Sequence, residues 1–142
     1  MLSEFPHRVV LADDVVLYRR VLRTILEGGR DLEVVGEASD GLQLLALLGS
    51  LPTVPDLAIV DISMPNLGGI GATSRIKSAY PGMKVLIVSI HMEKEYVREA
   101  LSAGADGYLL KEGADSELFS AIEKIRSGGT YISPILIGAV GL

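Results

Sequence analysis

The chain has 142 residues, of which 49% are hydrophobic and 22% are charged. This composition is too apolar for a disordered chain, and the length predicts one compact domain with its own core. The formal net charge of −5 argues against a surface that grips nucleic acid, and the lack of cysteine excludes disulfides, cysteine nucleophiles and thiolate metal sites.

The two ends of the chain carry no predicted membrane segment. The first eight residues lack the apolar core of a signal peptide. Residues 127–142 are uncharged, but they are fewer than the roughly 20 apolar residues that a membrane helix needs. We therefore expect a cytoplasmic protein without a membrane partner.

Five short apolar segments alternate with five longer segments of helical spacing. The short segments are nearly free of charge, which is typical of strands buried on both faces. They cover residues 9–11, 33–36, 57–60, 85–88 and 107–110. Leu17, Val21 and Ile25 recur every four residues and predict the first helix. The other predicted helices cover residues 40–48, 69–79, 94–103 and 115–127, with Asp40 and Asp115 as N-caps.

This alternation predicts an α/β fold in which strands run parallel and helices cover both faces of the sheet. We expect a doubly wound (βα)5, flavodoxin-like three-layer sandwich with a five-stranded parallel sheet. Residues 1–130 are predicted to form this domain. Residues 131–142 are predicted to be an apolar tail that packs on the domain, forms a dimer contact or begins a linker.

Polar side chains end four of the predicted strands. Asp13 and Asp14 follow the first strand, and the third, fourth and fifth are followed by Asp61, Ser89 and Lys111. Each residue alone has an ordinary interpretation as a helix cap, a turn residue or a solvated side chain. The carboxyl ends of parallel strands meet at one edge, however, so these groups are expected to converge.

The converging groups predict a phosphoryl-transfer site. Three like charges close together need compensation, and Mg²⁺ prefers such oxygen ligands. A lysine opposite them suits an anionic oxygen. A carboxylate beside Mg²⁺ can attack a phosphoryl group and form an acyl phosphate.

Two longer segments, residues 55–65 and 103–111, resemble the receiver domain of two-component response regulators. Residues 35–41 and 128–134 are similar to the LuxR/NarL-type subfamily, which joins a receiver to a helix-turn-helix domain. The resemblance implies phosphorelay signal transduction: a receiver domain over residues 1–130 that controls a transcriptional effector lying outside this chain. Residues 131–142 would then begin the linker.

The resemblance also implies roles for single residues. Asp61 would accept a phosphoryl group from a sensor histidine kinase and help to hold Mg²⁺. Asp14 would bind Mg²⁺ directly, Asp13 mainly through water, and Ser63 through its backbone carbonyl. Lys111 would pair with the phosphoryl group.

A hydroxyl–aromatic switch is implied as well, in which Ser89 moves towards the phosphoryl group and Tyr108 follows inward. The ordinary alternative for Tyr108 is a half-buried ring with its hydroxyl at the surface. Ser63 and His91 flank the expected pocket, where they could limit access of water, although His91 could also be an exposed loop residue. The first helix offers a set of side chains that either face a kinase or are solvated, namely Tyr18, Arg19, Arg20 and Arg23.

Further expectations concern activity and partners. The receiver is expected not to be an enzyme beyond its own phosphorylation and dephosphorylation, and a homodimer is compatible with the sequence. DNA contact is expected only through a helix-turn-helix domain absent from this chain. One alternative is a stand-alone receiver that acts through protein contacts. Another is a Mg²⁺-dependent phosphatase-like hydrolase, which would need a carboxylate where Ser63 stands, two residues after Asp61.

Overall fold

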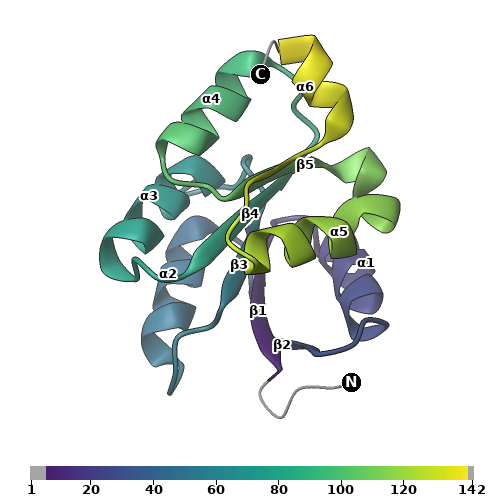
Figure 1. Cartoon of the computed structure of the whole chain (residues 1–142). Coiled ribbons are helices and arrows are strands. Elements are labelled where there is room, and N and C mark those ends of the chain that lie inside the picture. The colour runs from purple at the N-terminus through teal and green to yellow at the C-terminus, as the bar shows by residue number, and fades with distance from the viewer. Residues whose placement is uncertain (1–5, 141–142) are drawn as a thin grey trace.

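Strands and helices alternate along residues 6–140, which are the residues that the computed structural model describes (Figure 1). The elements are β1 (His7–Ala12), α1 (Val16–Glu27), β2 (Leu32–Ala38), α2 (Gly41–Ser50), β3 (Leu57–Val60), α3 (Gly69–Ala79), β4 (Lys84–Ser89), α4 (Lys94–Ser102), β5 (Gly107–Leu110), the short 3₁₀ helix η1 (Lys111–Gly113), α5 (Ala114–Arg126), β6 (Tyr131–Ile132) and α6 (Pro134–Val140).

All strands of the sheet are parallel, in the order β2-β1-β3-β4-β5-β6. The predicted α/β architecture is therefore confirmed, with one strand more than the five expected. The additional strand β6 pairs with β5 through Gly107 opposite Tyr131 and Tyr108 opposite Ile132. Because β6 has only two residues, it carries no apolar run from which a strand could be predicted.

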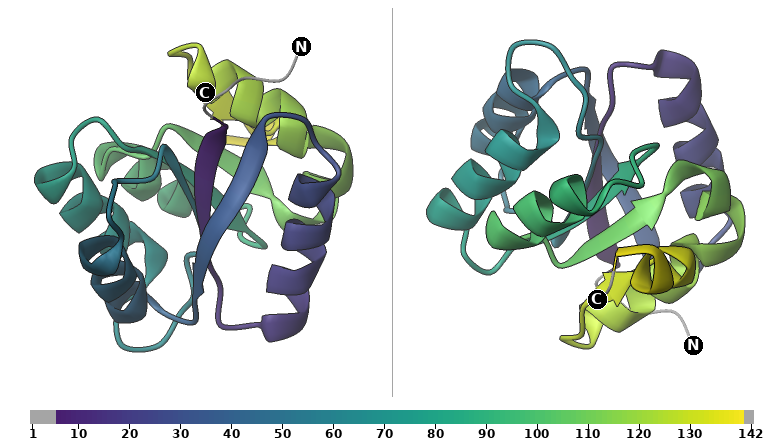
Figure 2. Two further views of the ribbon diagram at one scale, coloured as in Figure 1. Left: turned by 90° about the horizontal axis from the view of Figure 1, so that it is seen from below. Right: turned by 90° about the horizontal axis from the view of Figure 1, so that it is seen from above.

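Helices cover both faces of the sheet, and each face has its own core. Helices α1 and α5 lie on one face, and α2, α3 and α4 lie on the other (Figures 1 and 2). The first core joins α1 and α5 to alternate residues of the central strands, such as Leu11 and Ile59. The second core uses the intervening residues, such as Val10 and Val60. The central strands are thus buried on both sides, as their continuous apolar runs indicate.

The helix ends show which boundary signals hold. Asp40 caps α2, where its side chain accepts a hydrogen bond from the backbone nitrogen of Gln43. Asp115 does not cap α5: the helix begins at Ala114, so Asp115 lies in the first turn and complements the helix dipole there. Gly104 follows α4 with a φ of 105°, a conformation that favours glycine.

The segment after α5 packs on the domain. Helix α6 lies beside α4 (Figure 1), and the Leu136 side chain is fully buried in the second core. Its neighbours Ile135 and Ile137 are exposed. Gly141 and Leu142, the end of the expected tail, lie outside the described residues, as do residues 1–5 at the amino terminus.

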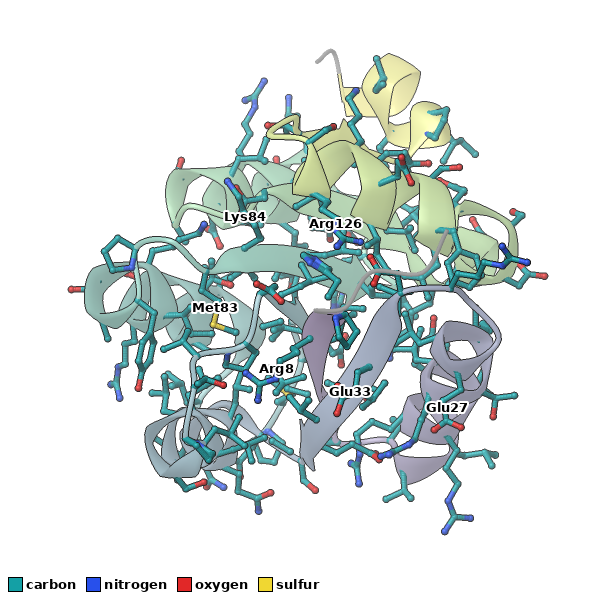
Figure 3. The ribbon with its side chains drawn as sticks, turned by 60° about the horizontal axis from the view of Figure 1, so that its bottom comes forward. Arg8, Glu27, Glu33, Met83, Lys84 and Arg126 are labelled. Atoms are coloured by element: carbon teal, nitrogen blue, oxygen red, sulfur yellow. The ribbon has the colours of Figure 1, made fainter. Side chains whose placement is uncertain are left out.

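The two edges of the sheet differ in what they present. Figure 3 looks onto the edge where the strands begin, with Arg8 and Lys84 at the starts of β1 and β4. The predicted site lies at the other edge, where the strands end. Within residues 6–140, no helix has both the length and the apolarity that crossing a membrane requires.

Candidate functional site

Three carboxylates meet where β1 and β3 end. Asp13, Asp14 and Asp61 each place one carboxylate oxygen within 4.8 Å of the others. Asp13 and Asp61 are buried, whereas Asp14 is exposed. The predicted convergence of these residues is therefore present, because β1 and β3 are direct neighbours that run in the same direction.

Lys111, which follows β5, supplies the positive charge at this cluster. Its Nζ lies 2.8 Å from Oδ2 of Asp13 and 3.7 Å from Oδ2 of Asp61. The ring of Tyr18 lies under the ammonium group, with 4.4 Å between Nζ and the ring centroid. The Tyr18 hydroxyl also donates to the Lys111 backbone carbonyl, at 3.4 Å. Tyr18 thus belongs to the site and limits the positions that Lys111 can adopt.

Asp61 is held at the base of the site. Its backbone nitrogen donates to the carbonyl of Ala12, which continues the β1–β3 ladder by one bond. The pKa of Asp61 is raised from 3.8 to about 6, chiefly because burial penalises the charged form. The Lys111 ammonium group opposes this shift, and the Asp13 carboxylate adds to it. A cation that binds next to Asp61 would therefore stabilise its charged form.

Ser89 and Tyr108 meet at the backbone of His91. Ser89 is fully buried, and its Oγ accepts a hydrogen bond of 3.0 Å from the backbone nitrogen of His91. The Tyr108 ring is also fully buried, and its hydroxyl donates to the carbonyl of His91 at 2.8 Å. The pKa of Tyr108 is raised to about 12, chiefly because burial penalises the charged form of its hydroxyl. The alternative of a half-buried ring with a surface hydroxyl is therefore wrong.

The His91 side chain contacts Ser63 on one side and Tyr96 on the other. Its Nε2 shares a hydrogen bond of 2.9 Å with Oγ of Ser63, and its ring stacks on Tyr96 with centroids 4.2 Å apart. His91 lies in the loop after β4, and its side chain is half-buried, with 22% accessible. A cavity of about 130 Å³ lies between the ends of β4 and β5, lined by Ser89, Ile90, Met92, Leu110, Lys111 and Glu112.

The arginines of α1 do not form one solvated face. Arg19 turns towards the site, where it donates to the carbonyl of Asp13 and to the carboxylate of Glu37. Arg20 is exposed. This division could not be predicted from the sequence, because Glu37 lies near the end of β2 and its contact with Arg19 depends on how α1 packs.

The groups at this edge are suited to a hard cation and an anionic ligand. The donor set of the cluster consists of carboxylate oxygens, which Mg²⁺ prefers. Burial is the main cause of the raised pKa of Asp61, and a bound cation would offset this penalty on the charged carboxylate. Lys111 and the hydroxyl of Ser89 lie on the side where an anion bound to Asp61 could be stabilised.

Comparisons with known proteins agree on one family. Residues 9–123 match the model of the response regulator receiver domain. The chain is 38% identical over 132 residues to the transcriptional regulatory protein DegU of Brevibacillus brevis, covering 93% of this chain and 55% of that protein. It is also 38% identical over 128 residues to the oxygen regulatory protein NreC of Staphylococcus carnosus (strain TM300), covering 89% of this chain and 58% of that protein.

A solved structure shares almost the whole fold. It is a two-component response regulator of the LuxR family from Aurantimonas sp. SI85-9A1, with a TM-score of 0.90 and 32% identity over 96% of both chains. The chain thus spans somewhat more than half the length of DegU and NreC, and nearly the full length of the Aurantimonas structure.

Proposed function

Because this chain belongs to the response regulator receiver domain family, we propose that it accepts a phosphoryl group on Asp61 and changes conformation in response. The observation that carries the proposal is the meeting of three carboxylates and one ammonium group at the carboxyl edge of the sheet. Asp61 is buried there, beside the other two carboxylates and Lys111.

The proposed step is a direct displacement at phosphorus. A carboxylate oxygen of Asp61 forms a bond to phosphorus, while the bond from phosphorus to the donor breaks and the donor keeps that electron pair. From a phosphohistidine the leaving group is an imidazole, and from a small acyl phosphate it is a carboxylate. Lys111 is close enough to follow the new charge with little movement, because its Nζ already lies 3.7 Å from Asp61.

Mg²⁺ fits the donor set of this site. When bound, it would neutralise charge on the transferred phosphoryl group. The residues proposed to hold it are Asp13, Asp14 and Asp61, together with the backbone carbonyl of Ser63. Asp13 is already engaged by Lys111 and is the one most suited to act through water, whereas Asp14 is exposed and open to a direct ligand role.

The proposed response uses Ser89 and Tyr108. A phosphoryl group adds three strong acceptors, and the Ser89 hydroxyl can donate to one of them. That movement would weaken the bond between Ser89 Oγ and the His91 nitrogen. Because the His91 carbonyl also holds the Tyr108 hydroxyl, the loop after β4 would carry the change towards α4.

The proposed partners follow from the relatives. We propose a sensor histidine kinase as the donor, in the cytoplasm, and a transcriptional effector as the output, since DegU is a transcriptional regulatory protein. Residues 131–142 would lead on to that effector, and DNA contact would belong to it. A homodimer remains part of this proposal, as does the alternative of a stand-alone receiver that signals through protein contacts.

A phosphorylation assay tests the proposal. The protein is incubated with Mg²⁺ and a small acyl phosphate, and acid-stable and acid-labile phosphate are measured with peptide mapping. We expect one acid-labile phosphate per chain, located on Asp61 and lost in Asp61→Asn. Asp115→Asn, which removes an exposed carboxylate of α5, is the matched control and should label normally.

Two results would overturn the assignment. If Asp61→Asn is still labelled at another carboxylate, Asp61 is not the acceptor. If the protein hydrolyses many phosphate esters per site, the phosphatase-like alternative takes its place, despite the serine at position 63.

A further inference from the structure

Arg19 links the acidic loop after β1 to the end of β2. Its Nη1 donates to the backbone carbonyl of Asp13 at 2.6 Å, and its Nε donates to Oε1 of Glu37 at 2.9 Å. The Arg19 side chain is only 13% exposed. We propose that Arg19, anchored by Glu37, is a positioning residue that sets the geometry of Asp13 and Asp14 for binding a divalent cation.

Glu37 is itself fixed. Although burial favours the neutral acid, hydrogen bonds from Arg23 and Arg19 hold the pKa of Glu37 below its usual value. Arg23 Nη1 lies 2.6 Å from Oε2, so the two arginines engage the two oxygens of one carboxylate. Glu37 also lies opposite Leu11 in the β1–β2 pairing, directly beside the end of β1. The anchor is therefore part of the sheet.

The contact between Arg19 and Asp13 is one of three hydrogen bonds that fix the backbone at Asp13. The nitrogen of Asp13 donates to the carbonyl of Ala38, and Oδ1 of Asp13 accepts from the nitrogen of Val15. Arg19 holds the remaining group, the carbonyl that belongs to the peptide bond between Asp13 and Asp14. Rotation of this peptide would move both carboxylates, so Arg19 restricts the placement of each.

Arg19 acts through position rather than charge. A positive charge near three carboxylates would by itself weaken cation binding. Glu37 pairs with the guanidinium group and offsets that charge. The planar group also bridges two acceptors at once, which a lysine ammonium on a flexible stem does less well. Loss of Arg19 should therefore weaken cation binding, the opposite of what removing a repulsive charge would do.

Isothermal titration with Mg²⁺ alone tests this role. Removal of a group that orients metal ligands typically costs 10–100-fold in metal affinity. We expect Arg19→Ala to raise the Kd for Mg²⁺ about 10-fold and Arg19→Lys to raise it by about threefold. Glu37→Gln, which loosens the anchor, should shift the Kd in the same direction. Arg20→Ala, which removes the exposed neighbouring arginine, is the matched control and should leave the Kd unchanged.

A second readout separates positioning from general loss of structure. In the phosphorylation assay, Arg19→Ala should need more Mg²⁺ for half-maximal labelling yet approach the wild-type rate at saturating Mg²⁺. An equal or lower Kd for Arg19→Ala would overturn the proposal, as would a rate that saturating Mg²⁺ does not restore while the variant remains folded by circular dichroism.

This inference rests on the proposed function but fails separately from it. If wild-type protein is labelled on Asp61 and Arg19→Ala binds Mg²⁺ as tightly as wild type, only the role of Arg19 is lost. If wild-type protein is not labelled on Asp61, the proposed function fails whatever the titrations give.

Discussion

The ammonium group of Lys111 lies 2.8 Å from a carboxylate oxygen of Asp13, in direct ion-pair contact. The same group is 3.7 Å from Asp61, the residue proposed to carry the phosphoryl group. Lys111 therefore neutralises a carboxylate that is also proposed to help hold Mg²⁺. Cation binding and the position of Lys111 should be linked, because both draw on the negative charge of Asp13.

Lys111→Met should bind Mg²⁺ more tightly than wild type while accepting phosphoryl groups more slowly. Removal of the ammonium group frees Asp13 for the cation, and a gain of three- to tenfold in affinity corresponds to about 0.7–1.4 kcal/mol. Titration calorimetry and the labelling rate measure the two effects. Lys94→Met, at an exposed position of α4, is the control. Weaker Mg²⁺ binding by Lys111→Met would contradict the competition.

Asp61→Asn should stabilise the fold at neutral pH in the presence of EDTA. The folded-state pKa of about 6 exceeds the ordinary value of 3.8, so the folded protein binds more protons between these values. The stability of wild type should therefore fall as the pH rises through this window and level off above it. Asparagine does not titrate, so the variant does not lose stability as the pH rises through this window.

The expected gain for Asp61→Asn at pH 7.5 is roughly 1–3 kcal/mol in the free energy of unfolding, since a pKa difference of one unit between the folded and unfolded states corresponds to about 1.4 kcal/mol. Urea denaturation at pH 4 and pH 7.5 measures it, and most of the gain should vanish at pH 4. An equal gain at both values would show that the charge of Asp61 is not its source.

Gly69→Ala should damage both the fold and the site. A Cβ at this position would overlap the backbone oxygen of Asp61, so either α3 or the end of β3 must shift. We expect a loss of roughly 2 kcal/mol or more in the free energy of unfolding, together with slower labelling.

Gly49→Ala is the matched control for that substitution. It lies in α2 with no atom within 4 Å of an added Cβ, and should stabilise the protein by about 0.5–1 kcal/mol. Denaturation of both variants tests the contrast, which would be refuted if Gly69→Ala were as stable as wild type.

Glu117→Ala should release the segment that follows α5. Oε1 of Glu117 accepts hydrogen bonds from the Tyr131 hydroxyl at 2.7 Å and from Ser133 Oγ at 3.1 Å. Ser133 is buried and also accepts from the backbone nitrogen of Leu110. Without the carboxylate, two buried or half-buried hydroxyls lose an acceptor, which costs about 1–3 kcal/mol locally.

Hydrogen–deuterium exchange measures this release. Residues 131–136 should exchange faster in Glu117→Ala, while β1 and β3 keep their protection. Glu123→Ala, an exposed substitution on the same helix, is the control. Unchanged exchange of residues 131–136 would show that Glu117 does not hold the segment.

The parts of the molecule predictable from sequence are those that depend on local pattern. Apolar runs such as that of β3 show which strands are buried on both faces, and the polar residue after each run marks the edge where Asp61 and Lys111 meet. Parallel pairing then brings these residues together, because it aligns the ends of strands that lie far apart in the sequence.

The parts that could not be predicted depend on packing. Arg19 contacts Asp13 and Glu37 only because of the way in which α1 packs on the sheet. In the sequence, Arg19 cannot be told apart from its exposed neighbour Arg20. The hydrogen bond from the Tyr108 hydroxyl to the His91 carbonyl likewise depends on the course of the loop after β4. No periodicity in the sequence indicates either of these contacts.

Strand β6 has a further consequence for the behaviour of the protein in solution. It supplies hydrogen bonds to the outer side of β5: Tyr131 donates to the carbonyl of Asp106, and Ser133 donates to that of Tyr108. An open strand edge is a template on which other chains can add, and a very short edge strand limits such growth. After β6, Ser133 is followed by Pro134, where the chain turns into α6. The short strand therefore leaves only two residues of open edge on this side of the sheet and covers the buried strand β5.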